Sequence, residues 1–172
     1  MEPENEIINR VASSSIKTLD LEQYYEPGER VLLDIKDQLY QGLILKEKNF
    51  RDFIKSHDWS QYQNKFVAIT CSEDAIVPTW AYMLLTSVLE PFVRTIVFGG
   101  LHDLETKIFF ESLSRIDWRQ FKDAKVVIKG CSKVAVPIAA YVEATRLMRP
   151  YAASIMFGEP CSTVPVYKKS KV

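Results

Sequence analysis

The second half of the chain contains one pattern twice. A shift of 59 positions aligns the following pairs without a gap: Asp58-Trp59 with Asp117-Trp118, Val77-Pro78 with Val136-Pro137, Ala81-Tyr82 with Ala140-Tyr141, Pro91 with Pro150, and Phe98-Gly99 with Phe157-Gly158. Self-similarity at a fixed spacing indicates that one structural unit occurs more than once. We therefore expect a duplicated core over residues 58–172, with copies at 58–103 and 117–162.

Each copy contains a helical segment between two short apolar runs of the kind found in buried strands. In the first copy the strands are expected at 66–70 and 95–98, and the helix begins at Val77-Pro78. The second copy repeats this order, with strands at 126–128 and 154–157, and a helix near 104–115 links the copies. Strands joined by a helical crossover run parallel. The sequence therefore predicts an α/β fold with a mainly parallel central sheet built from two strand–helix–strand repeats.

Residues 1–57 have no second copy and are expected to form an N-terminal cap or edge segment over this core. Within them, 16–21 alternates like a strand and 30–35 is a further strand candidate, whereas 38–44 and 50–55 suggest helical pieces. A chain of 172 residues is long enough for a sizeable core. We expect one compact domain or a closely fused pair of half-domains.

Composition excludes several classes of protein. The chain has 22 basic and 22 acidic residues, which argues against a general nucleic-acid binder. No apolar run approaches the roughly 18 residues of a transmembrane helix, so we expect no membrane partner. The acidic N-terminus does not resemble a signal peptide, and we expect a cytoplasmic protein with reduced thiols. The oligomeric state is not indicated.

Four metal-ligating residues follow the predicted strands. Cys71, His102, Cys131 and Cys161 each come just beyond the carboxyl end of one strand, and the shift of 59 places His102 opposite Cys161. The carboxyl edge of a parallel sheet is where ligand sites gather. Three cysteines with one histidine are an established zinc shell. The sequence predicts one metal site, with zinc as the expected ion and iron or a small iron–sulfur cluster as alternatives.

Two features weaken this pattern. There is no Cys-x-x-Cys pair, and Cys71 and Cys131 are 60 rather than 59 positions apart. Free cysteines are also often small apolar core residues, although the joint placement of four candidates favours a shared site. If one ligand were missing, the open position would suit catalysis, with Glu159 as the best candidate general base. The alternative for Glu159 is a solvated loop carboxylate.

Two other functions stay open. The chain is alternatively a metal-free partner in sulfur transfer or redox chemistry, with the thiolate of Cys131 or Cys161 as nucleophile. It is otherwise a purely structural interaction module whose cysteines belong to the core. The sequence contains no P-loop, G-x-G-x-x-G or G-x-S-x-G motif, so a nucleotide-binding protein or serine hydrolase has no support.

The segments around the cysteines also carry a family resemblance. Cys71-Ser72, Lys129-Gly130-Cys131-Ser132 and Gly158-Glu159-Pro160-Cys161 resemble motifs of an uncharacterised bacterial family that is catalogued only as a domain of unknown function. The resemblance covers nearly the whole chain and brings no established activity. Members of that family are often encoded near iron–sulfur cluster assembly genes. The resemblance therefore implies iron–sulfur assembly proteins as partners and a role in iron–sulfur or metal metabolism.

Overall fold

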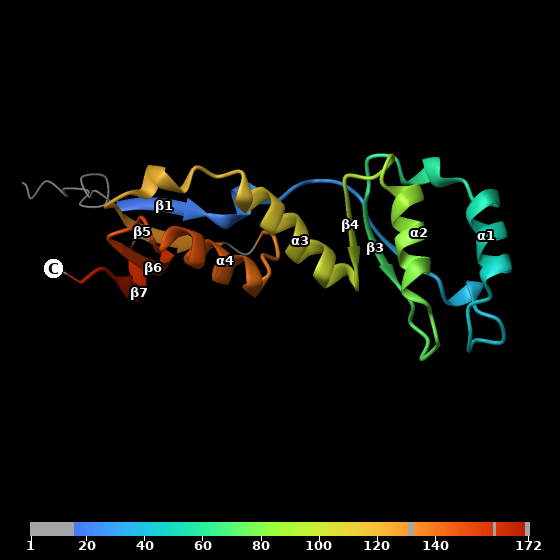
Figure 1. The fold of residues 1–172 in the computed structure, drawn as a ribbon. Coiled ribbons are helices and arrows are strands. Elements are labelled where there is room, and N and C mark those ends of the chain that lie inside the picture. The colour runs from blue at the N-terminus through green and yellow to red at the C-terminus, as the bar shows by residue number, and fades with distance from the viewer. Residues whose placement is uncertain (1–15, 131–132, 160, 171–172) are drawn as a thin grey trace, which may run out of the picture. The chain divides into compact units, whose positions relative to one another are not determined.

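The chain folds as two compact units, each with its own sheet. A computed structural model describes residues 16–130, 133–159 and 161–170 (Figure 1). Unit 1 comprises Met1–Tyr25 and Phe110–Val172, and unit 2 comprises Glu26–Phe109. Unit 2 is thus inserted into the sequence of unit 1. No helix among the described residues is long and apolar enough to cross a membrane.

Unit 2 contains a parallel sheet of three strands in the order β2–β3–β4 within the described residues. Its elements in chain order are β2 (Arg30–Asp34), α1 (Glu47–Ser56), β3 (Phe66–Thr70), α2 (Thr79–Leu89), β4 (Thr95–Phe98) and the larger part of α3 (Leu101–Ser114). Short 3-10 helices follow β2 and precede β3, namely η2 (Lys36–Gln38) and η3 (Trp59–Tyr62).

The two faces of the unit 2 sheet are covered by different helices. Val67 and Ile69 of β3 belong to a buried cluster that includes side chains of α1 and α2. Phe66 and Ala68, which point to the opposite face, form a second cluster with Leu104 of α3. Because both faces are covered, β3 is a continuous apolar run, as is typical of parallel strands.

Unit 1 contains a mixed sheet in the order β1–β5–β6–β7. The strands β1, β5 and β6 run parallel, and β7 runs antiparallel to β6. Its elements in chain order are β1 (Ile16–Asp20), η1 (Leu21–Tyr24), the end of α3, η4 (Trp118–Phe121), β5 (Lys125–Lys129), α4 (Ile138–Met148), β6 (Ser154–Glu159) and β7 (Ser162–Lys168).

Four pairs of elements in the two units begin 59 residues apart. This spacing relates η3 to η4, β3 to β5, α2 to α4, and β4 to β6. Individual contacts follow it as well. The indole Nε1 of Trp59 donates to the carbonyl of Ile54 at 2.8 Å, and that of Trp118 donates to the carbonyl of Leu113 at 3.2 Å. The spacing seen in the sequence is therefore also a spacing of elements and contacts.

The prediction of one central sheet was wrong, because the described strands form two sheets. A strand has only two sides for hydrogen bonding. Both sides of β3 are taken by β2 and β4, and both sides of β5 are taken by β1 and β6. The N-terminal segment supplies β1 and β2, so that it contributes one edge strand to each sheet. Both strands were expected, but their partners were not.

The strand β7 was not among the elements expected from the sequence. It pairs with β6 over Ser154–Glu159, with a register shift between Ile155 and Met156. Pro165 has no N–H to donate, and proline within a sheet is confined to edge strands and bulges. Two other elements also differ. The helix α3 begins at Leu101 rather than near 104. The helix expected at 38–44 does not form: η2 ends at Gln38, and Tyr40 and Ile44 close a turn by an antiparallel β-bridge.

We expect Gly158→Ala to lower the free energy of unfolding by about 2 kcal/mol. Gly158 has φ of 121°, and a Cβ there would lie 2.5 Å from the carbonyl oxygen of Ser162. Gly42→Ala is the matched control. Gly42 has φ of 69°, and no atom lies within 4 Å of the added Cβ. This substitution should therefore lower the free energy of unfolding by only about 1 kcal/mol, the cost of placing alanine in the left-handed region. Urea unfolding followed by circular dichroism compares the two. Equal losses of unfolding free energy in the two variants would show that the close contact of the added Cβ with the Ser162 carbonyl oxygen does not destabilise the fold.

Candidate functional site

The carboxyl ends of the unit 2 strands bring three polar segments to one edge of the sheet. Asp34 ends β2, Cys71 and Ser72 follow β3, and Gly99 to His102 follow β4. These strands are parallel neighbours, with Asp34 opposite Thr70 and Ile69 opposite Phe98. This edge is where ligand sites of parallel α/β proteins usually lie.

Asp34 holds the beginning of the loop that carries Cys71. Its Oδ1 accepts hydrogen bonds from the backbone N–H of Ser72 and of Lys36, each at 3.1 Å. Burial acts to raise the pKa of Asp34, but hydrogen bonds from the hydroxyl and amide of Ser72 and the amide of Lys36 outweigh it and hold the pKa below its ordinary value. The carboxylate therefore stays ionised at neutral pH and fixes the loop backbone next to Cys71.

Tyr82 of α2 lies close to the same loop. Burial raises the pKa of its phenol, and electrostatic interactions with Cys71 and Asp34 raise this pKa further. Its ring makes an edge-on contact with Phe98, with centroids 4.9 Å apart. The phenol is therefore a neutral group beside the Cys71 thiol, which itself donates weakly to the carbonyl of Glu73 at 3.7 Å.

His102 lies in the first turn of α3 and is exposed. The preceding turn is tight: the N–H of Gly100 donates to Oδ2 of Asp103 at 2.7 Å. Gly99 has φ of 132°, and a Cβ there would come within 2.4 Å of Asp103 Oδ2. Gly99 thus lets the chain pass from β4 directly into the helix that carries His102.

The unit 1 edge uses different side chains for a similar purpose. The carboxylate of Glu22, just beyond β1, accepts hydrogen bonds from the N–H of Lys133 at 3.1 Å and of Val134 at 3.2 Å. These residues follow Cys131 and Ser132, which lie outside the described residues. A carboxylate from the N-terminal segment therefore contacts the loop after β5, as Asp34 contacts the loop after β3.

The predicted general base Glu159 lies in an ion-pair cluster at this edge. The ammonium of Lys129 is 3.4 Å from Oδ2 of Asp20 and 3.7 Å from Oε2 of Glu159. The Glu159 side chain is 53 % exposed. An exposed carboxylate next to an ammonium is the arrangement of a surface ion pair, so the geometry gives Glu159 no feature of a buried catalytic base.

The four predicted metal ligands are divided between the units. Cys71 and His102 belong to unit 2, Cys161 belongs to unit 1, and Cys131 lies outside the described residues. Cys161 is exposed in the turn between β6 and β7. Although the shift of 59 pairs His102 with Cys161, one begins a helix and the other lies in a hairpin turn. The structure therefore does not test the predicted set as a whole.

Within the residues described, no three side chains of His, Cys, Asp or Glu are grouped so that they could hold a metal ion. Unit 2 alone thus offers Cys71 and His102 without a third described ligand. The other histidine, His57, packs instead: its ring lies 4.4 Å from that of Trp59, and its Nε2 is 3.2 Å from the hydroxyl of Tyr62.

Sequence reasoning missed Asp34 and Glu22, the two carboxylates that hold the loops. A signal was present, because β1 and β2 both end in Asp followed by a buried apolar residue, Leu21 or Ile35. In each case this aspartate accepts the N–H two residues further on, from Glu22 or Lys36, at 3.1 Å.

Comparison with known proteins identifies the family. The sequence profile described as "Protein of unknown function (DUF2480)" matches residues 5–169. The chain belongs to this family. The resemblance predicted from the cysteine segments is thereby confirmed, whereas the link to iron–sulfur genes stays a prediction. No curated protein and no solved structure matches the chain.

We expect Asp34→Ala to lower the free energy of unfolding by about 1–2 kcal/mol at pH 7, because two backbone amides lose a charged acceptor. The pKa of Asp34 is lower in the folded chain than in the unfolded chain. The stabilisation that the Asp34 carboxylate gives is therefore fully present above the pKa of the unfolded chain, about 3.9. It is lost as the pH falls through the lower pKa of the folded chain.

Urea unfolding at a series of pH values tests this expectation. The difference between Asp34→Ala and the parent protein should shrink as the solution is made more acidic. The control is Asp37→Ala, an exposed carboxylate three residues away. A difference for Asp34→Ala that does not change with pH would show that its charge does not hold the loop.

Proposed function

We propose that this member of the family binds one transition-metal ion through Cys71, His102, Cys131 and Cys161. Zinc is the expected ion, because thiolate and imidazole ligands in a tetrahedral set suit it best. Iron or a small iron–sulfur cluster is the alternative for the same donors. The two units are proposed to be copies of one strand–helix–strand plan, each providing two ligands.

The observation that carries the proposal is the position of Cys71 and His102 in unit 2. They follow β3 and β4, which are hydrogen-bonded parallel neighbours, and so they reach the same edge of one sheet. Cys71 is partly buried and its loop is held by Asp34, which reduces the entropy lost when a ligand is fixed. His102 is exposed and available to an ion.

The donor set determines the role proposed for the ion. Four side chains on one zinc ion close the shell, which favours a structural or carrier role over catalysis. A carrier of metal or of a cluster would work with iron–sulfur assembly proteins, the partners that the family resemblance implies. Metal-binding thiols must be reduced, which agrees with the proposed cytoplasmic location.

Metal quantitation tests the proposal directly. The full-length chain, purified without an affinity tag under reducing conditions, should contain about one mole of zinc or iron per mole of protein. Cys71→Ser and Cys161→Ser should each lower the metal retained against a chelator by at least about tenfold, because each removes a thiolate ligand. Absorption in the visible range separates an iron–sulfur cluster from colourless zinc.

Ser162→Ala is the matched control, since Ser162 is exposed and adjoins Cys161 in the chain. It should retain the full metal content. Protein that remains metal-free after incubation with zinc would contradict the proposal. A single fast-reacting thiol in such metal-free protein would favour the sulfur-transfer or redox alternative instead.

A further inference from the structure

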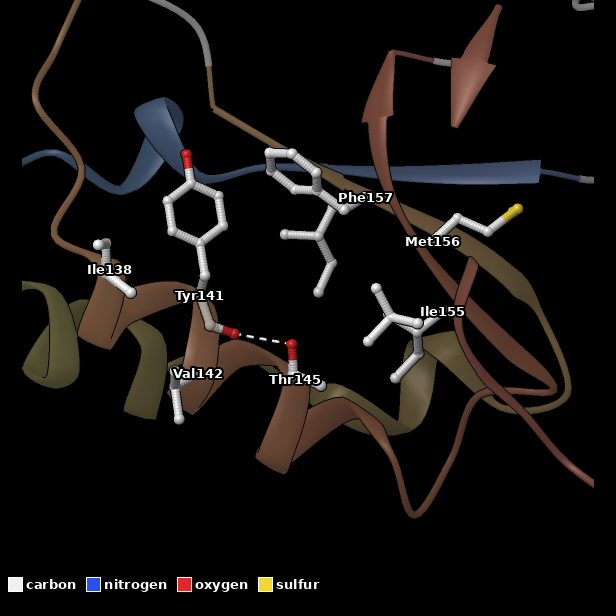
Figure 2. Close-up of a pocket in the computed structure, with 9 residues that line it drawn as sticks. Ile138, Tyr141, Val142, Thr145, Ile155, Met156 and Phe157 are labelled. Atoms are coloured by element: carbon white, nitrogen blue, oxygen red, sulfur yellow. Dashed lines mark hydrogen bonds between the residues drawn. The ribbon is translucent and has the colours of Figure 1, made fainter. Parts of the chain in front are cut away.

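Unit 1 contains an apolar groove between α4 and the strands β6 and β7 (Figure 2). Its volume is about 560 Å³, within the range of small-molecule sites. We call it the α4–β7 groove, and it is lined by Ile128, Ile138, Tyr141, Val142, Thr145, Ile155, Met156, Phe157 and Val166.

The groove presents almost only hydrocarbon. None of its lining residues is charged, and the two that carry hydroxyl groups are Tyr141 and Thr145. The hydroxyl of Thr145 donates to the backbone carbonyl of Tyr141 at 2.7 Å (Figure 2), so its hydrogen is already used within the helix. The phenol ring of Tyr141 lies edge-on to Phe157, with centroids 5.7 Å apart. An occupant of this groove therefore meets side-chain carbon.

Several large apolar side chains on this groove are open to solvent. Ile138 is 80 % exposed, Val142 is 64 % exposed, and Phe157 and Val166 are about half exposed. A single exposed apolar residue needs no explanation, but a contiguous group around a concave surface marks a binding site. The free energy gained by covering such a surface comes from the hydrophobic effect, which acts on any occupant of matching shape.

The strand β7 gives this groove a wall that has no equivalent in unit 2. Val166 belongs to β7, close to the register shift that bends its pairing with β6. In unit 2 the described sheet ends at β4, which is the equivalent of β6. The helix position equivalent to Val142 is Met83, which is 68 % exposed. Unit 2 thus supplies an exposed apolar helix surface without the wall.

We propose that the α4–β7 groove binds the hydrocarbon part of an uncharged small molecule, such as a prenyl or acyl chain. The part of the ligand inside the groove is expected to be uncharged, because the lining provides no charged side chain and placing a charge against hydrocarbon is costly. A small molecule fits better than a flat partner surface because the lining residues form a concavity bounded by helix and hairpin. This site is separate from the cysteines, so the proposal does not depend on metal binding.

Binding of an apolar dye to the full-length chain tests the inference. Nile red should bind saturably at about one site per chain, and the neutral prenyl alcohol farnesol should displace it. Val142→Lys should weaken both interactions by at least about tenfold, because it brings an ammonium to the groove. Met83→Lys, the same change at the equivalent exposed position of α2, should leave affinity within about twofold.

A second pair of variants distinguishes a loss of binding from a loss of folding. Ile138→Lys should weaken binding, whereas Thr79→Lys at the equivalent position of α2 should not, and circular dichroism confirms that all four variants fold. Saturable binding that is unchanged in Val142→Lys and Ile138→Lys, or that is lost equally in Met83→Lys, would overturn the assignment. So would an absence of dye binding together with self-association that Val142→Lys abolishes, since the groove would then be a contact between copies of the chain.

Discussion

Two short strands near the N-terminus determine how this chain can fold. β1 and β2 are separated by only a 3-10 helix and a turn, yet β1 pairs with β5 and β2 pairs with β3. The chain must therefore pass from one sheet to the other between Tyr24 and Arg30, and it returns through α3 only after unit 2 is complete. The side chains of Leu19 and Ile35 are both buried, and Ile35 belongs to the core cluster of unit 2.

The same two segments also prepare the candidate site. Asp34 accepts a backbone N–H group from the loop that follows β3 and carries Cys71, and Glu22 accepts the N–H groups of Lys133 and Val134 after β5. A carboxylate that accepts two amides is worth more than a surface ion pair, because charged hydrogen bonds are strong and directional. Strand pairing therefore determines where the loops lie, and the carboxylates restrict how their backbones are oriented.

The sequence predicted individual helices and strands better than it predicted which strands pair. The apolar run at 66–70 and the prolines before α2 and α4 were sufficient to place β3 and both helices. Alternation indicated strands near β1 and β2, but periodicity does not reveal which strand lies beside another. β7 was not predicted, because the repeated pattern ends before it, although a proline such as Pro165 is compatible with an edge strand. The candidate site was predicted from the residue types that follow the strands. This approach selects cysteines and histidines, but it overlooks carboxylates such as Asp34 and Glu22 that accept backbone hydrogen bonds.

The most direct test of this account is amide hydrogen exchange on a chain that begins at Glu26 and so lacks β1. If β1 completes the sheet of unit 1, residues 110–170 should lose protection, because β5 loses its edge partner and the core loses Leu19 and Leu21. Residues 26–109 should keep the protection that they have in the full chain. Retained protection in β5 and β6, or an equal loss across both units, would contradict the division of the chain described above.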